Sequence, residues 1–493
     1  MRVSAQHVAR VSMAGAALAA AVFVLAQTRT DVDLWGHVRF GLDIVNTGAL
    51  HHQDPYSFTS DRAWINHEWL AEVVFALAWQ FGRTPGLIAV KLACAIGALA
   101  LIAAAVRESR AGIGEVGFLV GLTLLGILPR VGQIRPQLFS VILFATLILI
   151  FVRSQTRGQY VLFWTIPIVV LWANFHGGWL VGVGAVAVWC TGEAYAARTR
   201  RAAALVVGVA LLCAAATLIN PYGWGLWSFL LGTVRFGRDA IREWGAAWTN
   251  PATLLIWIVF ALLLGGALTR VKRVPSNPAV VLIPLGLGLA SLKVSRLDAF
   301  FAMSVVGLLA GPVALLFSQR NSARTEASRH WLFASITVAV LLVASIPASR
   351  RAFTCIGFFD PRWPEPQVVD EIRSRQLTGR MLTYFDWGEY AIWHLHPAVK
   401  VSMDGRRETV YSDRTVDRHV ALYNGAPEGF AYLRELDPDY VWLPRQLPVT
   451  GALADQGWTI LFDGPRAVLL GKTGSAWPAR SAALGSPRCF PGP

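Results

Sequence analysis

Charged residues are scarce in this sequence. Only 15% of its 493 residues are Asp, Glu, Lys or Arg, whereas 55% are hydrophobic. A soluble protein of this length could not bury so much apolar surface, so the composition excludes the soluble globular class. Acids are the scarcer sign, with 30 Asp and Glu against 44 Lys and Arg and a net charge of +14. Nucleic-acid-binding proteins also carry an excess of positive charge. The distribution of the basic residues along the chain therefore decides between a membrane protein and a nucleic-acid-binding protein.

Hydrophobic runs of membrane-spanning length recur through the first 348 residues. We interpret eleven of them as transmembrane helices, at 8–27, 85–106, 116–129, 137–152, 160–173, 177–193, 202–219, 252–268, 279–292, 298–317 and 331–348. The first run could also be a cleaved signal peptide, because Val24-Leu25-Ala26 is a passable cleavage site. We favour an uncleaved anchor, and both interpretations leave the next loop outside.

Lys and Arg gather in the short loops between these runs. They are Arg107, Arg110, Arg153, Arg157, Arg198, Arg200, Arg201, Arg270, Lys272, Arg273, Arg320, Arg324 and Arg329. With eleven spans, all these loops fall on the same side as the N-terminal Arg2 and Arg10, which is therefore predicted to be cytoplasmic. Residues 28–84, 220–251 and those after 348 are then extracytoplasmic. The charge therefore reflects membrane topology, and we expect no nucleic-acid partner.

Cysteine is scarce as well, and several catalytic signatures are missing. None of the five Cys has the spacing of a zinc site, and the sequence has neither a nucleotide-phosphate loop nor a convincing Ser or Cys nucleophile arrangement. Cys94, Cys190 and Cys213 lie within predicted spans, where a small apolar role is the default. Cys355 and Cys489 bracket the outer C-terminal part and could form a disulfide in an oxidising compartment.

The outer loop 28–84 has a predicted structure of its own. Apolar residues recur at helical spacing in its first half, at Trp35, Val38, Leu42 and Val45. Gly48 then suits a helix C-cap. This pattern predicts a short amphipathic helix that lies on the membrane surface, and residues 68–81 predict a second, interfacial helix.

The composition changes after residue 348. Short apolar segments predict strands at 380–385, 399–403, 440–443, 458–462 and 467–470, and helices at 368–375 and 429–436. We expect a small C-terminal α/β domain over 349–473, behind a transmembrane domain over 1–348 that includes the loop 28–84. The tail 474–493 is rich in Ala, Ser, Gly and Pro, which predicts disorder.

Two acids lie directly after the first span. Asp31 and Asp33 lie there with His37, and His67 and Glu68 lie near the end of the same loop. Acids close to hydrocarbon are costly unless they have a function or a partner. Asp33 and His37 share one face of the predicted helix. In the plainer alternative, Asp31 only caps this helix and Asp33 is a solvated helix residue.

These residues resemble the GT-C superfamily of membrane glycosyltransferases, and in particular a group of bacterial members. The resemblance rests on Asp33-Leu34-Trp35-Gly36-His37, Asp54-Pro55-Tyr56-Ser57-Phe58-Thr59, His67-Glu68-Trp69-Leu70, Trp387-Gly388-Glu389-Tyr390 and Asp404-Gly405-Arg406-Arg407. It is strong over the first loop and elsewhere rests on the number of spans and the topology. One departure is that many GT-C enzymes have adjacent acids, whereas Val32 separates Asp31 from Asp33.

The resemblance implies an α-helical polytopic membrane protein of about 11 transmembrane helices with a small C-terminal α/β extracytoplasmic domain. It also implies an enzyme that transfers a sugar from a polyprenyl-phosphate-linked donor to a glycan, lipid or protein acceptor on the outer face of the membrane. Inverting transfer needs a carboxylate that takes the proton of the acceptor hydroxyl. We expect Asp33 to be this base, with Asp31 as the alternative.

A lipid phosphate leaving group needs cationic partners, and the candidates on the predicted outer side are Arg130, Arg135, Lys293 and Arg296. Gln137 beside Arg135, and His176 beside a Gly pair, could line the same substrate site, as could His37, His67 and Glu68. Each cation could instead be an interfacial anchor. The charge pair Asp404–Arg406 is expected to be a solvated turn.

A divalent metal ion is an open question at this stage. Asp31, Asp33, His67 and Glu68 could bind one, or His67 and Glu68 could merely pack the loop. The functional alternatives are a polysaccharide polymerase or ligase, a transporter and a non-catalytic scaffold. The absence of an internal repeat argues against the transporter.

Overall fold

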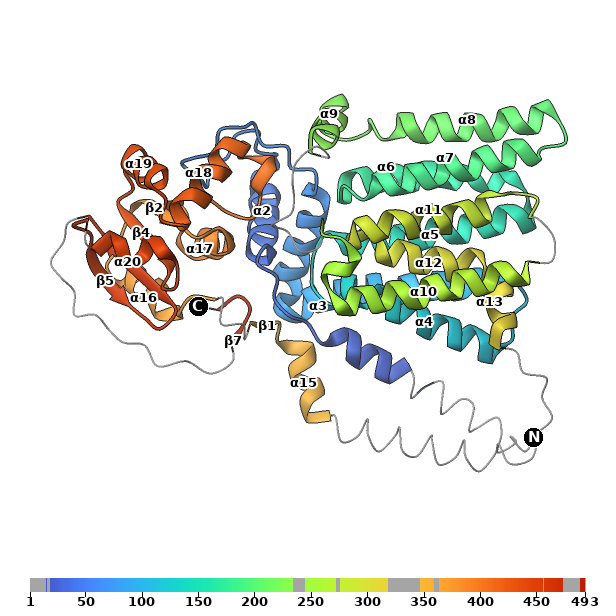
Figure 1. Ribbon diagram of the computed structural model, residues 1–493, viewed down its shortest axis with the longest axis horizontal. Helices are drawn as coiled ribbons and strands as arrows, with labels where there is room; N and C mark the ends of the chain where they lie inside the picture. The colour runs from blue at the N-terminus through green and yellow to red at the C-terminus, as the bar shows by residue number, and fades with distance from the viewer. Residues whose placement is uncertain are drawn as a thin grey trace. The chain divides into compact units, whose positions relative to one another are not determined.

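The computed structural model describes residues 15, 18–233, 244–271, 275–317, 346–358, 363–454, 456–472 and 488–492. The chain divides into two compact units, and Figure 1 traces their elements. Unit 1 comprises Met1–Thr28 and Ile88–Thr354, and unit 2 comprises Arg29–Leu87 and Cys355–Pro493. By its contacts the first loop therefore groups with the C-terminal part, whereas the sequence suggested grouping it with the spans.

Unit 1 is a helical bundle. Its helices are the second half of α3 (Trp69–Glu108), α4 (Ile113–Val131), α5 (Gln137–Arg157), α6 (Thr165–Phe175), α7 (Trp179–Ala196), α8 (Arg200–Ala216), α9 (Trp224–Thr233), α10 (Pro251–Arg270), α11 (Ala279–Lys293), α12 (Asp298–Leu308), α13 (Ala310–Phe317) and α15 (Ile346–Thr354). Short 3-10 turns, η1 (Gln159–Trp164), η3 (Ala247–Thr249) and η4 (Ser295–Leu297), precede α6, α10 and α12.

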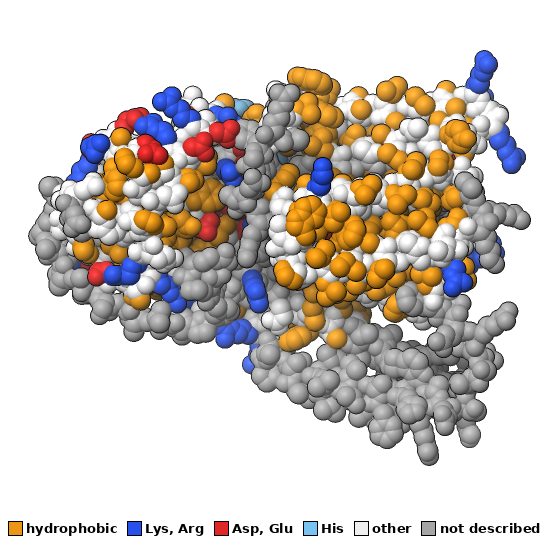
Figure 2. Space-filling model, in the orientation of Figure 1, with side chains coloured by type: hydrophobic (Ala, Val, Ile, Leu, Met, Phe, Trp, Pro, Cys, Tyr) orange, Lys and Arg blue, Asp and Glu red, His pale blue; other side chains and the backbone are white. Residues whose placement is uncertain are grey.

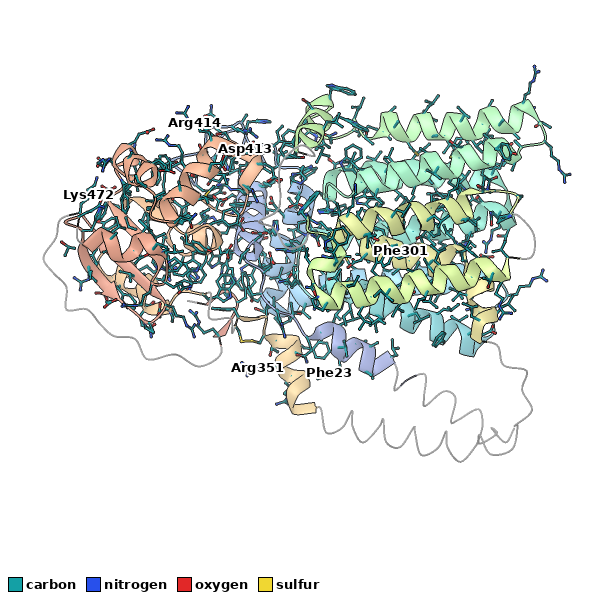
Figure 3. All side chains as sticks on the ribbon, viewed as in Figure 1. Phe23, Phe301, Arg351, Asp413, Arg414 and Lys472 are labelled. Atoms are coloured by element: carbon teal, nitrogen blue, oxygen red, sulfur yellow. A yellow bond between two sulfur atoms is a disulfide. The ribbon has the colours of Figure 1, made fainter. Side chains whose placement is uncertain are left out.

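The outer flank of this bundle is apolar. Figure 2 shows hydrophobic side chains over its visible face, and Leu211, Leu262 and Leu289 are 67%, 70% and 69% exposed. By contrast, Phe301 of α12, labelled in Figure 3, lies inside the bundle and is 1% exposed. An apolar surface of this extent is what lipid chains would cover.

The number of spans stays partly a prediction. Among the described residues, five helices are long and apolar enough to cross a membrane, or six if the bent pair Ser295–Leu308 and Ala310–Leu316 is one span. Two shorter apolar helices, Gln159–Phe175 and Ala279–Lys293, fall below that length. The predicted span 331–348 lies largely, and 8–27 partly, outside the described residues. The total of eleven is therefore untested.

The break in α3 agrees with the predicted boundary between the helix 68–81 and the span 85–106. Arg83 has φ 49° and ψ −141°, and Pro85 follows inside the helix. Proline removes a backbone donor and clashes with the preceding turn, which explains a kink at this point.

Unit 2 contains a five-stranded sheet. Its strand order is β3 (Val399–Val401), β2 (Gly379–Thr383), β4 (Tyr440–Pro444), β6 (Ala467–Gly471) and β5 (Thr459–Asp463). β2 runs parallel to β3 and β4, whereas β6 is antiparallel to β4 and β5. All five strands predicted from the sequence form strands.

Five helices accompany this sheet. They are α16 (Pro366–Ser374), α17 (Gly388–Leu395), α18 (Asp413–Tyr423), α19 (Pro427–Leu436) and α20 (Pro448–Ala454). The sequence predicted α16 and α19 but missed the other three. The buried core between strands and helices includes Leu382, Val441 and Leu470 from the strands, with Leu422 and Leu433 from α18 and α19.

The first loop supplies α2 (Leu34–Thr47) to unit 2, and Gly48 ends it in the left-handed conformation, as predicted. Part of the apolar stripe of α2 packs against protein, since Trp35 and Val38 are buried whereas Leu42 and Val45 are partly buried. The Trp35 ring lies between 4.7 and 5.5 Å, centroid to centroid, from four aromatic rings of the C-terminal part, Phe358, Trp363, Tyr390 and Phe490. The helical periodicity was therefore correct, and the position on a membrane surface stays a prediction.

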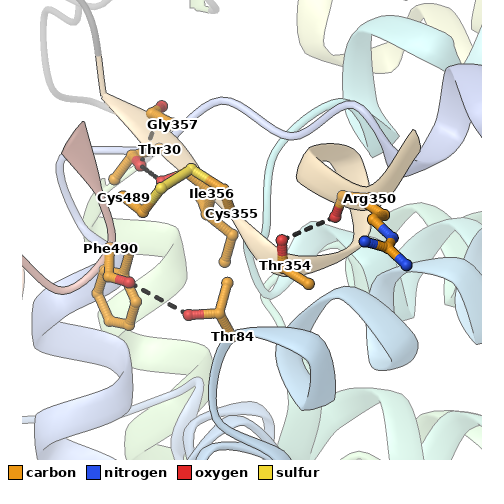
Figure 4. Close-up of a disulfide and its surroundings, with 9 residues drawn as sticks. All are labelled: Thr30, Thr84, Arg350, Thr354, Cys355, Ile356, Gly357, Cys489 and Phe490. Atoms are coloured by element: carbon orange, nitrogen blue, oxygen red, sulfur yellow. Dashed lines mark hydrogen bonds between the residues drawn. A yellow bond between two sulfur atoms is a disulfide. The ribbon is translucent and has the colours of Figure 1, made fainter. Parts of the chain in front are cut away.

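Residues 488–492, within the range 474–493 for which disorder was predicted, have a defined structure. β7 (Arg488–Cys489) pairs with β1 (Gly357–Phe358), and Cys489 forms a disulfide with Cys355 (Figure 4). The hydroxyl of Thr84 also donates a hydrogen bond of 3.2 Å to the Phe490 carbonyl. Composition alone could not reveal these ties, and the remainder of this tail lies outside the described residues.

Candidate functional site

Asp33 lies directly before α2 in unit 2, at the N-cap position. Its backbone N–H donates a hydrogen bond of 3.1 Å to Oδ1 of Asp31, and the Leu34 N–H donates one of 3.3 Å to the Asp31 carbonyl. Asp31 is 4% exposed. The Asp31 carboxylate thus shapes the turn, as the plainer alternative expected for this residue, whereas the Asp33 carboxylate makes no cap bond to the described residues of α2.

A second acid, Glu389 of α17, lies beside Asp33. Oε2 of Glu389 accepts a hydrogen bond of 3.1 Å from the Gly36 N–H in the first turn of α2. A Cβ placed on Gly405 would lie 2.2 Å from Oδ1 of Asp33 and 3.0 Å from Oε1 of Glu389. Both carboxyl groups therefore lie against the same glycine of the turn after β3.

The pKa of Glu389 is raised. Burial, followed by the negative charges of Asp33 and Asp404, keeps the pKa of Glu389 well above the usual 4.5, although Arg406 opposes this shift. A buried carboxyl beside other carboxylates titrates late because the anion loses water and meets like charge. The site therefore places two acids side by side, one buried in α17 and one at the start of α2.

His37 faces a different carboxylate. Its Nδ1 lies 3.4 Å from Oε1 of Glu72, and the Asn66 amide donates a hydrogen bond of 2.6 Å to Oε2 of Glu72. Burial alone would lower the pKa of His37, but the bond to Glu72 and the charges of Glu68, Glu72 and Asp33 raise it to about 9. His37 is therefore a buried imidazolium at neutral pH.

His67 and Glu68 lie next to each other at the start of α3. The His67 Nε2 is 3.7 Å from Oε1 of Glu68, and the Glu68 N–H donates a hydrogen bond of 3.3 Å to the Asn66 side-chain oxygen. Across the described ranges, no group of three or more His, Cys, Asp and Glu side chains has an arrangement that could hold a metal ion. The divalent ion thus stays a hypothesis without a preformed ligand set in this part of the chain.

Arg406 is buried, which corrects the expected solvated turn. Its guanidinium donates two hydrogen bonds to Asp54, of 2.7 and 2.8 Å, and two to Asp404, of 2.8 and 2.6 Å. Tyr411 donates a further one of 2.8 Å to Asp404. Burial opposes the charge on Arg406, but the two carboxylates outweigh it and raise the pKa of this arginine above its ordinary value.

In unit 1, Arg130 is engaged in a buried ion pair. Its Nε and NH2 donate hydrogen bonds of 2.8 and 2.9 Å to the two carboxylate oxygens of Asp298, and NH2 donates another of 2.9 Å to the Ser295 carbonyl. Asp298 in turn accepts the Ala299 N–H at the start of α12. This geometry gives Arg130 a structural partner and weakens its candidacy as a phosphate ligand.

Three other candidates of unit 1 come together at Arg296. The Gln137 side-chain oxygen accepts a hydrogen bond of 2.6 Å from Nε of Arg296, with the amide oriented toward the guanidinium. The NH2 of Arg296 lies 3.4 Å from Nε2 of His176, and its Cζ lies 5.5 Å from the centroid of the Trp244 ring. One cluster of polar side chains therefore contains Arg296, Gln137 and His176.

Both ring nitrogens of His176 face hydrogen-bond donors. Nδ1 of His176 accepts a hydrogen bond of 3.0 Å from the Gly178 N–H, and it lies 2.7 Å from the Ser140 hydroxyl. Nε2 faces the guanidinium of Arg296, which, like the backbone N–H, can only donate. Lys293 is exposed at the end of α11, and Arg135 is partly buried just before α5.

No protein-family model and no curated protein sequence matches this chain. Solved structures do match it. Arabinofuranosyltransferase AftD from Mycobacteria covers 94% of the chain at 13% identity and a TM-score of 0.56. ArnT from Cupriavidus metallidurans covers 93% in its apo state and 95% when bound to undecaprenyl phosphate, at 13% identity and TM-scores of 0.54 and 0.52. The chain has the GT-C fold.

The two GT-C relatives differ in length. The chain spans 40% of AftD but 97% and 99% of the two ArnT structures. A structural likeness at 13% sequence identity shows the fold only. The reaction has to be argued from the residues of this chain.

Sequence reasoning missed one residue of this candidate site. Glu389 belongs to a segment noted only for its resemblance, between the aromatic residues Trp387 and Tyr390. An acid inside such an apolar stretch is the signal that could have identified it, because Glu is almost never fully buried without a partner.

Proposed function

We propose that this GT-C chain is a membrane glycosyltransferase that transfers a sugar from a polyprenyl-phosphate-linked donor to a glycan, lipid or protein acceptor. The observation that supports this proposal is the position of the Asp33 carboxylate, which lies against Gly405 beside the buried Glu389 instead of capping its own helix. The likeness to ArnT, of which one structure is bound to undecaprenyl phosphate, supports the choice of donor.

In the proposed reaction, Asp33 acts as the general base. The acceptor hydroxyl attacks the anomeric carbon while Asp33 takes its proton, and the bond from that carbon to the phosphate oxygen breaks. The electron pair leaves with the phosphate, and attack from the opposite side inverts the configuration. Asp31 is the weaker candidate, because its carboxylate already accepts the Asp33 N–H and is buried.

Arg296 is the residue we assign to the phosphate, within unit 1. A guanidinium binds phosphate through charge-assisted hydrogen bonds, and Gln137 holds this one in place. His176, whose Nε2 lies 3.4 Å from NH2 of Arg296, is the second candidate on the same side. Lys293 and Arg135 are secondary candidates, and His67 and Glu68 are assigned to the acceptor.

The outer face of a bacterial cytoplasmic membrane is the proposed location of unit 2. The disulfide between Cys355 and Cys489 supports this choice, because such bonds persist in oxidising compartments. The basic loops of the sequence support cytoplasmic placement of the opposite helix ends.

Replacement of the two acids in the native host tests the proposal. We expect Asp33→Asn to accumulate one glycosylated polyprenyl phosphate and to deplete one envelope glycan, both measured by mass spectrometry at a normal protein level. The same result with Asp31→Asn alone would move the base to Asp31. Asp417→Asn, an exposed carboxyl on α18, is the matched control and should change neither pool. If neither acid variant nor deletion of the whole chain alters any glycan or carrier lipid, the proposal fails.

A further inference from the structure

The first turn of α2 is capped in an unusual way. An Asp at the N-cap position ordinarily accepts the N–H of the second or third helical residue through its own carboxylate. In α2 the third residue is Gly36, and its N–H donates instead to Oε2 of Glu389, 353 residues further along the chain. A distant acid has taken the hydrogen bond that Asp33 would normally receive.

We propose that Glu389 is a positioning residue that caps α2 in place of Asp33 and thereby keeps the Asp33 carboxylate out of its own helix and directed toward Gly405. This inference rests on the proposed function, since it assigns Glu389 to the service of the same base. It makes the C-terminal part of unit 2 a contributor to the reaction, beyond its role in packing.

Two glycines make this arrangement possible. A Cβ on Gly36 would lie 2.1 Å from Oε2 of Glu389, and a Cβ on Gly405 would lie 2.2 Å from Oδ1 of Asp33. Real Cβ atoms do not approach oxygen so closely, so any side chain at either position would displace a carboxyl group. The two carboxyl groups can therefore occupy these positions only because Gly36 and Gly405 have no side chain.

Capping by Glu389 does not depend on its protonation state. Burial and the charges of Asp33 and Asp404 raise its pKa, Glu72 adds to the rise, and Arg406 opposes it. A carboxyl group accepts the Gly36 N–H through its carbonyl oxygen when it is neutral and through a carboxylate oxygen when it is ionised.

The test compares Glu389→Gln with Glu389→Ala in the purified full-length protein. A polyprenyl-phosphate sugar fraction from the host membrane serves as donor, and transfer is measured at saturating and limiting amounts. Glutamine keeps a neutral acceptor oxygen, so we expect its saturating rate to stay within about three-fold of wild type. Alanine lets Asp33 return to the Gly36 N–H, so we expect the saturating rate to fall about ten-fold or more at an unchanged half-saturating donor amount.

Carboxyl labelling provides a readout that does not depend on the substrate. Carbodiimide with glycine ethyl ester modifies accessible carboxyl groups, and peptide mass spectrometry follows Asp33. We expect slower labelling of Asp33 in Glu389→Ala and unchanged labelling in Glu389→Gln. Glu428→Ala, which removes an exposed carboxyl group from the first turn of α19, is the control and should match wild type in rate and labelling.

Gly36→Ala is a second variant in case Glu389→Ala does not fold. Alanine has a higher helix propensity than glycine, but its Cβ would displace Glu389 from the backbone N–H of residue 36. Gly36→Ala should therefore reproduce the loss of rate. Wild-type rate and labelling in Glu389→Ala or Gly36→Ala would overturn the inference, as would equal losses in the Gln and Ala variants of Glu389. If Asp33→Asn remains active while Asp31→Asn is inactive, the base moves to Asp31 and this inference falls with the assignment of Asp33; if both remain active, the proposed function itself fails. If Asp33→Asn is inactive while Glu389→Ala behaves as wild type, only the positioning role of Glu389 fails.

Discussion

Arg406 and Asp54 form a two-point ion pair across 352 residues of sequence. NH1 of Arg406 donates to Oδ1 of Asp54 at 2.7 Å, and NH2 donates to Oδ2 at 2.8 Å. Three rings from the first loop surround the guanidinium carbon at 4.7 to 5.2 Å, those of Phe40, Tyr56 and Trp64. Both partners of the pair are almost fully shielded from water, so the pair ties the first loop to the C-terminal part of unit 2.

Arg406→Ala should therefore destabilise unit 2 strongly. Removal of one partner from a buried pair costs about 3–5 kcal/mol, because the remaining charges of Asp54 and Asp404 lose their cation. Arg406→Lys should not restore stability, since an ammonium group cannot bind two carboxylates in the same fork geometry. The unfolding midpoint of purified protein, followed by tryptophan fluorescence, measures the effect.

Arg418→Ala is the control for Arg406→Ala. It removes an exposed ion pair with Glu435 and should leave the unfolding midpoint nearly unchanged. Equal shifts of the midpoint in Arg406→Ala and Arg418→Ala would contradict the stabilising role of Arg406.

Arg130→Ala should affect the stability of unit 1 more than the use of donor. Arg130 and Asp298 satisfy each other inside the bundle, so Asp298→Ala should produce a similar loss. The double variant should lose less than the sum of the two single variants, because the second change removes the charge that the first leaves unpaired. Thermal aggregation in detergent gives this comparison, and strict additivity of the two losses would refute the coupling.

Arg296→Gln should act on donor binding and leave stability largely intact. A charge-assisted hydrogen bond contributes about 1.5–3 kcal/mol, so the half-saturating donor amount should rise by roughly ten- to one-hundred-fold. Arg200→Gln is the matched control, because it removes the same charge from an exposed position at the start of α8, and Lys293→Gln tests the secondary candidate. A rise as large in Lys293→Gln would move the phosphate role away from Arg296.

The sequence predicted the sheet of unit 2 but only part of its helices. Short apolar segments bounded by polar ones gave all five strands. The buried side of α18 includes Thr415 and His419 beside Leu422 and Tyr423, so the helical stripe is half polar and its period is hard to recognise. α17 begins with Gly388, a poor helix former, and its burial comes from partners that local sequence does not contain.

The candidate site shows the same limit. The position of Asp33 after the first span was enough to single it out. The bond between Gly36 and Glu389 joins residues 353 positions apart, and no periodicity or spacing encodes such a pairing. The stripe of Trp35 and Val38 also looks the same in the sequence whether lipid or protein covers it, so its burial against aromatic rings of unit 2 needed the structure.

The stability of unit 2 should depend on pH through His37. The pKa of His37 is raised from 6.5 to about 9 in the folded state, where Glu72, Glu68 and Asp33 face it. A raised pKa stabilises the fold fully below pH 6.5, and this contribution, on the order of 3 kcal/mol, is lost as the pH rises through 9. Wild type should therefore exceed His37→Gln in unfolding midpoint at pH 6, and the two should converge above about pH 9. A constant difference between them at all pH values would show that His37 is not charged in the fold.

Reduction of the disulfide between Cys355 and Cys489 should loosen the end of the chain from α2. The bond closes a segment of 134 residues, and the C-terminal end that it holds contacts α2 directly, since the Trp35 indole donates a hydrogen bond of 2.8 Å to the Pro491 carbonyl. Loss of a native disulfide typically costs about 2–5 kcal/mol, so Cys355→Ser with Cys489→Ser should lower the unfolding midpoint.

The same double variant should also lower sugar transfer, because Trp35 lies two residues after Asp33 on the helix that carries the proposed base. Reductant should reproduce both losses in wild type and should have no further effect on the double variant, which serves as its own control. Mass spectrometry of alkylated peptides establishes that Cys355 and Cys489 are reduced in each sample. A wild-type protein that is fully reduced yet keeps its unfolding midpoint and its transfer rate would show that the pairing of β1 and β7 and the burial of Phe490 hold this end without the covalent bond.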